Sequence, residues 1–218
     1  MKTWKAIACV LAVLAAVPAV QADEERNWSV ANLGVGVQYW NAKDLDYFDG
    51  DGLWGANFLV RIRPIEYLGI DLRIGGEAAW EGESIRINGE KYDTDVVFGC
   101  VPAEAGLVLM LPVGNVVTLY GGGGVGYYYY DLDVESHEHH SHSNWDYDEH
   151  IGMEDDFGWY ALGGVSFRLA RHVSIFGEVR YTKTDTAFKH PADYGVSESD
   201  NEIDCSGVGG QIGVMFNF

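Results

Sequence analysis

The stretch ESHEHHSHSNWDYDEH, residues 135–150, concentrates residue types that bind metal ions. It holds five histidines and five acidic residues in sixteen positions. Imidazole nitrogens and carboxylate oxygens are ligands for Zn²⁺, Ni²⁺ and Cu²⁺. The candidate metal ligands are His137, His139, His140, His142 and His150.

The spacing of these histidines does not match a catalytic metal motif. Two histidines and a glutamate in the order H-E-x-x-H on a helix would form such a site, and that order is absent from the chain. The stretch therefore predicts weak capture of Zn, Ni or Cu, without a tightly bound cofactor. The alternative interpretation is a solvated polar loop.

The N-terminus predicts export from the cytoplasm. Lys2 and Lys5 precede the fifteen-residue apolar run AIACVLAVLAAVPAV, and the small-residue sequence VQA follows at 20–22. This run is shorter than the roughly 20 residues that a membrane-spanning helix needs. We interpret residues 1–22 as a cleaved signal peptide and residues 23–218 as one domain.

Beyond residue 22, apolar residues recur with a period of two. Strict alternation over about ten residues is the signature of a β-strand with two different faces. In the last segment the apolar positions are Val208, Ile212, Val214, Phe216 and Phe218. Similar alternation occurs near 28–40, 56–64, 67–79, 97–111, 116–130, 157–169 and 173–183. The sequence therefore predicts eight strands.

The connections between these strands alternate between short and long. Three are short, RPIEYLG, LPVGN and ARH, whereas 41–53, 80–95, 131–157 and 185–204 are long. This pattern is typical of an antiparallel up-and-down transmembrane β-barrel with short periplasmic turns and long extracellular loops. The alternative is a soluble eight-stranded barrel such as a lipocalin, with the apolar residues inside.

The residues opposite the apolar stripes favour the membrane barrel. Buried charges are costly unless they are paired, and the nearly balanced signs suit a closed lumen in which they neutralise one another. We expect Glu104 and Glu178 to neutralise arginines there. The predicted lumen charges are Arg61, Arg63, Asp71, Arg73, Glu77, Glu104, Arg168, Glu178 and Arg180.

The long connections carry most of the negative charge. They contain 25 of the 33 acidic residues and four of the 14 lysines and arginines, in a chain of net charge −19. The deficit of basic residues argues against nucleic acid as a partner. An anionic rim either keeps the protein soluble or binds divalent and cationic partners.

Two further residue groups bear on chemistry. Cys100 and Cys205 have lumen-facing parity near the ends of the fourth and eighth strands. These strands lie on opposite sides of the ring, so we expect two unpaired thiols. No serine or histidine lies in a recognisable nucleophile–base arrangement, so we expect no enzymatic activity.

Two segments resemble known outer-membrane proteins. The sequence GQIGVMFNF, with Phe216 and the terminal Phe218, resembles the C-terminal strand that the barrel-assembly machinery of Gram-negative bacteria recognises. The sequence LYGGGGVGYYYYD at 119–131 resembles a strand of the small OmpA/OmpX-like outer-membrane β-barrel proteins.

The resemblance covers about residues 28–218 in architecture. It implies an eight-stranded barrel in the Gram-negative outer membrane. We expect a monomer surrounded by outer-membrane lipid. The superfamily includes adhesins, structural anchors, small-molecule conduits and a few lipid A enzymes. For this chain we expect a non-enzymatic structural or surface-interaction role through the acidic loops, with an unnamed extracellular partner. The alternative is a conduit for small apolar solutes.

Overall fold

The computed structural model describes residues 28–45, 52–87, 90–139, 144–194, 197 and 201–218. The predicted signal peptide, 1–22, lies outside the described residues. No helix in the described part of the chain is long and apolar enough to cross a membrane.

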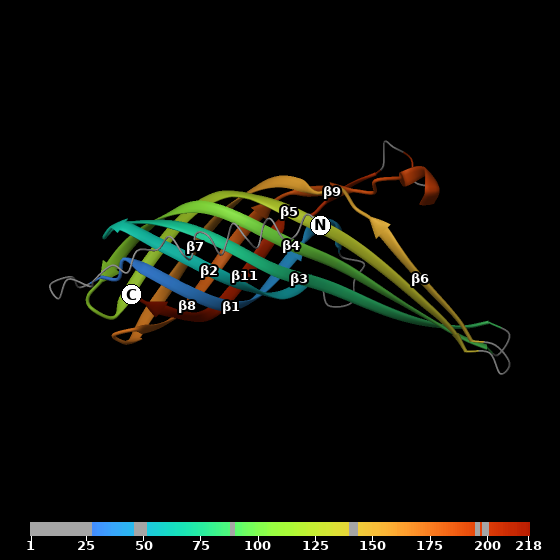
Figure 1. Ribbon diagram of the computed structural model, residues 1–218, viewed down its shortest axis with the longest axis horizontal. Coiled ribbons are helices and arrows are strands. Elements are labelled where there is room, and N and C mark those ends of the chain that lie inside the picture. Colours follow the sequence, from blue (N-terminus) through green and yellow to red (C-terminus); the bar gives the residue numbers. More distant parts are fainter. Residues whose placement is uncertain (1–27, 46–51, 88–89, 140–143, 195–196, 198–200) are drawn as a thin grey trace.

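Eight of the described strands close into an antiparallel barrel (Figure 1). They are β1 (Ala31–Ala42), β2 (Leu53–Ile65), β3 (Leu68–Ile87), β4 (Glu90–Val113), β5 (Val117–His139), β7 (Asp156–Ala170), β8 (Val173–Lys183) and β11 (Gly207–Asn217). The other described elements are β6 (Asn144–Gly152), β9 (Asp185–Ala187), β10 (Glu202–Asp204) and the 3₁₀ helices η1 (Lys43–Leu45) and η2 (Pro191–Tyr194).

The first and last strands of the barrel pair with each other. Asn32 lies opposite Asn217 in this seam, and Ala42 lies opposite Gly207. The backbone N–H of Phe218 donates to the carbonyl of Ala31 at 2.8 Å. The seam therefore removes the free sheet edge that an open sheet would leave.

The two faces of the strands separate apolar from polar residues as the alternation predicts. Leu109 and Ile212 are 69% and 67% exposed on the outer surface, whereas their neighbours Val108 and Gln211 are 1% and 7% exposed inside the barrel. An apolar outer surface suits lipid, so the soluble alternative is wrong. The predicted eight-stranded up-and-down membrane barrel is confirmed.

The short connections gather at one end of the barrel, together with Phe218. They are residues 66–67, 114–116 and 171–172. Gly114 begins the second of them with a φ of 69°, a left-handed conformation that glycine adopts without steric cost. In bacterial outer-membrane barrels the short turns face the periplasm.

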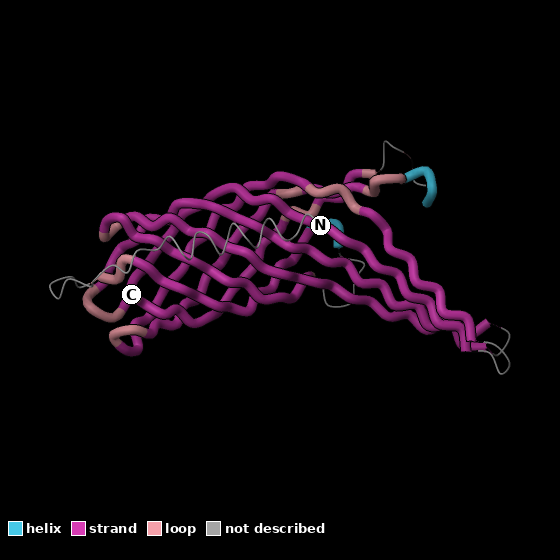
Figure 2. Tube along the Cα trace, viewed as in Figure 1, coloured by secondary structure: helices cyan, strands magenta, loops and turns pink. Residues whose placement is uncertain are grey.

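At the other end, four strands project far beyond the barrel (Figures 1 and 2). We call this projection the arm; it consists of 80–87 of β3, 90–99 of β4, 131–139 of β5, and β6. The sequence predicted loops at 80–95 and 131–157, and this prediction was wrong for most of both segments.

The arm is a sheet because the period of two continues into it. Asp131 and Asp133 alternate with Leu132 and Val134, which pack against the buried core. The strand ladders continue to the described tips, where Lys91 lies opposite His139. Each inner strand thereby finds hydrogen-bond partners on both sides, which a loop would lack.

An apolar cluster fills the lumen where the barrel meets the arm. Its buried members include Trp40, Leu53, Phe98, Cys100 and Cys205, and the partly buried Phe188 and Ile203 pack against it. Cys100 and Cys205 are both buried and neither forms a disulfide. They lie in the same cluster, and Cys205 lies between β10 and β11, next to the strand whose Ile203 packs against that cluster.

Candidate functional site

The lumen below the apolar cluster contains a network of ion pairs. Arg61 donates two hydrogen bonds to Asp71, from Nε at 2.6 Å and from Nη2 at 2.8 Å. Arg73 donates to Asp71 at 2.9 Å and to both carboxylate oxygens of Glu178, at 2.5 and 2.9 Å. Strands β2, β3 and β8 thus contribute four alternating charges, and Tyr120 of β5 donates to Glu178 at 3.2 Å.

A second group of charges lies closer to the barrel mouth. Arg180 of β8 donates to both oxygens of Glu104 on β4, with its Nη1 at 2.7 Å from Oε2. Tyr128 donates to the same carboxylate at 2.7 Å, and the Arg180 guanidinium lies 4.6 Å from the centre of the Tyr160 ring. The structure therefore places the predicted acids Glu104 and Glu178 beside Arg180 and Arg73, whereas Arg61 pairs with Asp71.

Neutral amides, which the sequence reasoning missed, connect to the remaining lumen acid. Gln38 donates to Glu77 and accepts a hydrogen bond from Asn57, which in turn accepts one from Gln211 at 2.7 Å. These residues are buried on β1, β2, β3 and β11. Their inward parity can be read from the sequence, although no charge marks them as lumen residues.

The last two predicted lumen residues lie near the short turns. Arg63 Nη2 donates to the backbone carbonyl of Glu66 at 2.5 Å, and its guanidinium lies 5.2 Å from the Trp28 ring centre. Arg168 lines the same end of the lumen. Both arginines therefore lie toward the short-turn end of the lumen.

Most of the predicted metal ligands cannot be placed as side chains. His140 and His142 lie outside the described residues. His137 and His139 belong to β5, opposite Asp146 and Asn144 of β6, but their side chains also lie outside the described part. His150 is described, on β6.

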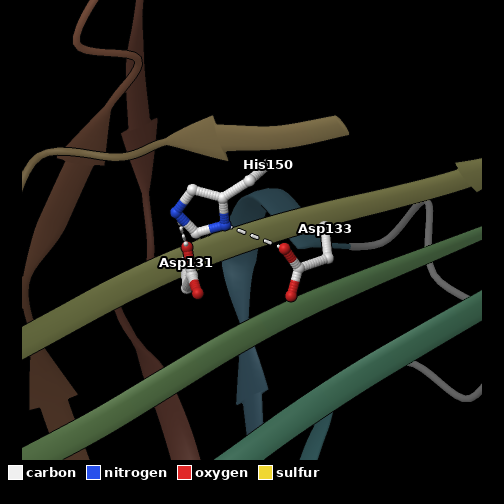
Figure 3. A group of neighbouring side chains, drawn as sticks. All are labelled: Asp131, Asp133 and His150. Carbon is white, nitrogen blue, oxygen red and sulfur yellow. Dashed lines mark hydrogen bonds and ion pairs between the residues drawn. The ribbon is translucent and has the colours of Figure 1, made fainter. Parts of the chain in front are cut away.

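His150 lies between two aspartates on the outer face of the arm (Figure 3). Its Nδ1 is 2.9 Å from Oδ1 of Asp133, and its Nε2 is 3.2 Å from Oδ1 of Asp131. Asp131 and Asp133 are two residues apart on β5, and Asp133 lies directly opposite His150. One ligand atom from each residue lies within 4.8 Å of the others.

The two carboxylates favour the protonated form of this imidazole. The hydrogen bond to Asp133 and the charge of Asp131 raise the pKa of His150 above its usual value of 6.5. Both ring nitrogens face carboxylate oxygens, and only a protonated imidazole can donate from both. Lys189, the nearby cation, acts in the opposite direction. A metal ion at this position would therefore compete with a proton.

The sequence pattern predicted His150 as a ligand but not its two aspartates. It assigned 131–157 to a loop, in which residues 17 to 19 positions apart have no fixed relationship. The signal that could have found them is the alternation D-L-D-V-E at 131–135. Read as a strand, it places Asp131 and Asp133 on one face.

The two C-terminal aromatic residues lie on the lipid-facing surface. Phe216 and Phe218 are 48% and 60% exposed. Phe216 lies opposite Leu33 of β1 and Val173 of β8. The strand that carries them thus completes the barrel wall.

The fold matches known outer-membrane barrels. OprG from Pseudomonas aeruginosa superposes with a TM-score of 0.54 at 16% identity, covering 88% of this chain and 97% of that one. Ail of Yersinia pestis, in complex with the heparin analogue sucrose octasulfate, gives 0.46 at 16% identity, with coverages of 88% and 99%. Neisserial surface protein A gives 0.45 at 11%, with coverages of 87% and 98%.

Sequence comparison places the chain in a family. No curated protein sequence is detectably similar to it. At 16% identity, OprG shows a shared fold alone. Residues 7–218, nearly the whole chain, match the family described as outer membrane protein beta-barrel domain. This chain therefore belongs to the outer membrane protein beta-barrel domain family.

Proposed function

We propose that this chain is a non-enzymatic outer-membrane barrel that engages cationic partners at the cell surface through its acidic arm. One observation carries the proposal. Asp95 of β4, Glu135 of β5 and Asp148 of β6 occupy one row of the sheet, each directly opposite the next. A bound cationic group would be attracted by all the acidic residues of such a row together.

A cationic peptide probe would test this proposal. We expect purified barrel in uncharged detergent to bind fluorescent hexalysine, and the D95N/E135Q/D148N variant to bind it about tenfold more weakly, since three charges contribute together. A matched variant, D46N/D49N/D51N, removes three acids from the segment 41–53 instead. Equal weakening in both variants would mean that overall charge, rather than the arm, attracts the probe.

The lumen supports a structural barrel more strongly than a conduit. The buried ion pairs of Arg61, Asp71, Arg73 and Glu178 occupy its middle, and the apolar cluster occupies its mouth. The alternative role, conduction of small apolar solutes, would require both groups to move.

Weak transition-metal capture is a second candidate function, favoured by the cluster of His150, Asp131 and Asp133. One imidazole and two carboxylates match the ligand preferences of Zn²⁺, Ni²⁺ and Cu²⁺. His150 and Asp131 side chains are 63% and 52% exposed, so bound ions would exchange readily with solvent. Further imidazoles would come from His137 and His139 of β5 and from His140 and His142, which follow β5 in the chain.

The surroundings of the barrel follow from its surface. We propose that outer-membrane lipid covers the exposed apolar residues, and that the monomeric barrel presents Phe216 and Phe218 to the barrel-assembly machinery during insertion. Export would be directed by residues 1–22. The prominent exposure of the two phenylalanines supports a role in recognition.

A further inference from the structure

A polar pocket of about 160 Å³ opens at the short-turn end of the lumen. Arg61 and Arg63 of β2 and Arg168 of β7 line it, and the turns 66–67 and 114–116 contribute to its rim. Glu66 is its acidic lining residue. We call this space the periplasmic pocket.

The periplasmic pocket carries an excess of positive charge. Three guanidinium groups, those of Arg61, Arg63 and Arg168, line it together with one carboxylate, that of Glu66. Asp71 neutralises Arg61 but is shared with Arg73. This positive charge contrasts with the net charge of −19 of the whole chain, most of whose acidic residues lie in the long connections at the opposite end.

Two buried donors of the pocket residues have no hydrogen-bond partner. These donors are Nη1 of Arg61 and Nε of Arg63, in residues that are 0% and 4% exposed. An unsatisfied buried donor costs about 1–3 kcal/mol, and more when it is charged. An acceptor that enters the pocket would satisfy such groups.

We propose that the periplasmic pocket binds a phosphate group. A phosphate offers several acceptor oxygens to the planar guanidinium donors, and arginine binds it through two parallel hydrogen bonds. Neutral hydroxyl donors line the pocket as well, from Ser29 and Thr118. The volume corresponds to about five water molecules, enough for a phosphate and some of its hydration. The phosphate comes either from the free anion or from a lipid headgroup at the periplasmic rim.

Calorimetry on the purified full chain, in a glycoside detergent without phosphate, would test the site. One titration uses inorganic phosphate, and a second uses monomeric dihexanoylphosphatidylglycerol. We expect R63Q and R168Q to weaken binding about tenfold each, the contribution of one charge-assisted hydrogen bond. The matched control is R171Q, which removes an exposed arginine from the 171–172 turn at the same rim. It should change affinity less than about twofold, because exposed charges interact weakly.

The two titrations distinguish the sources of phosphate. Binding of inorganic phosphate alone identifies the free anion, and binding of the lipid alone identifies a headgroup. Absence of heat with both probes would overturn the proposal. Equal weakening by R171Q and R168Q would also overturn it, since the rim would then attract anions without a defined site. Heat-modifiable electrophoretic mobility shows whether each variant folds. If R63Q does not fold, the affinity of R168Q for phosphate tests the proposal.

Discussion

Glu178 of β8 accepts two hydrogen bonds from Arg73 of β3 across the barrel lumen, at 2.5 and 2.9 Å. Three strands, β2, β1 and β11, separate these residues along the wall. Both side chains are buried, at 0% and 2% exposure. The pair therefore braces opposite parts of the wall directly, in addition to the strand ladders.

Replacing Glu178 should destabilise the barrel strongly. E178L leaves the Arg73 charge buried without this partner, which typically costs about 3–5 kcal/mol. E178Q keeps an acceptor and should cost less. Urea unfolding in lipid vesicles would measure both. V179L changes the adjacent lipid-facing residue and should leave the midpoint unchanged. An E178L midpoint equal to that of the parent would contradict the bracing role.

The filled lumen should block ion flow. An eight-stranded barrel has an interior that side chains just fill, and the described lumen holds paired charges below an apolar cluster. We expect no large, steady conductance from the purified protein in planar bilayers. Reproducible steps of porin size would instead favour the conduit.

Adjacent glycines on β7 should differ in how well they tolerate one added methyl group. A Cβ on Gly164 would lie 2.5 Å from Tyr120 Cζ and 2.7 Å from the Gly177 carbonyl oxygen, whereas one on Gly163 would meet nothing within 4 Å. G164A should cost about 1–3 kcal/mol through overpacking. G163A should stay within about 0.5 kcal/mol of the parent. Urea midpoints would compare them, and equal losses would contradict the assignment of inner and outer faces.

Metal capture at His150 should depend on pH. A metal needs the neutral imidazole, and Asp133 and Asp131 raise the pKa of His150 above 6.5. Affinity for Zn²⁺ or Ni²⁺ should therefore fall with decreasing pH, beginning above pH 6.5. Calorimetry at several pH values would measure this dependence.

Two variants separate the contributions of the arm histidines to metal capture. H150N should abolish binding at the described cluster. H137N/H139N/H140N/H142N should remove any contribution from the histidine run and leave that cluster intact. The absence of heat in the parent at neutral pH would leave the arm as a solvated polar surface. Unchanged binding in H150N would exclude His150 as a ligand.

The sequence was sufficient to predict the barrel and its two faces. Alternation depends on the period of two of a regular strand, so Leu109 could be assigned outward and Glu104 inward without knowing their neighbours. The ion-pair partners of the inward charges could not be predicted in this way. Whether Arg61 meets Asp71 or an acid on a distant strand depends on the strand stagger and tilt, which no single segment encodes.

The arm and its cluster of His150, Asp131 and Asp133 were missed for a related reason. Polar composition at 131–157 suggested a loop, although a sheet outside the membrane also has polar residues on its solvent face. Only pairing shows that Asp133 lies opposite His150. The alternating residues at 131–135 indicated a strand, but the contact between His150 and Asp133 follows only from the pairing register of β5 and β6.

The seam between β1 and β11 has a consequence for how quickly the barrel forms. Asn32 and Asn217, which bond across it, are 185 residues apart, whereas β4 and β5 are joined by residues 114–116 alone. Closing the longer loop costs more chain entropy, and such distant contacts slow folding. We therefore expect the joining of the two chain ends to limit the folding rate. Weakening that contact would then slow assembly, whereas weakening the β4–β5 hairpin would chiefly alter other steps.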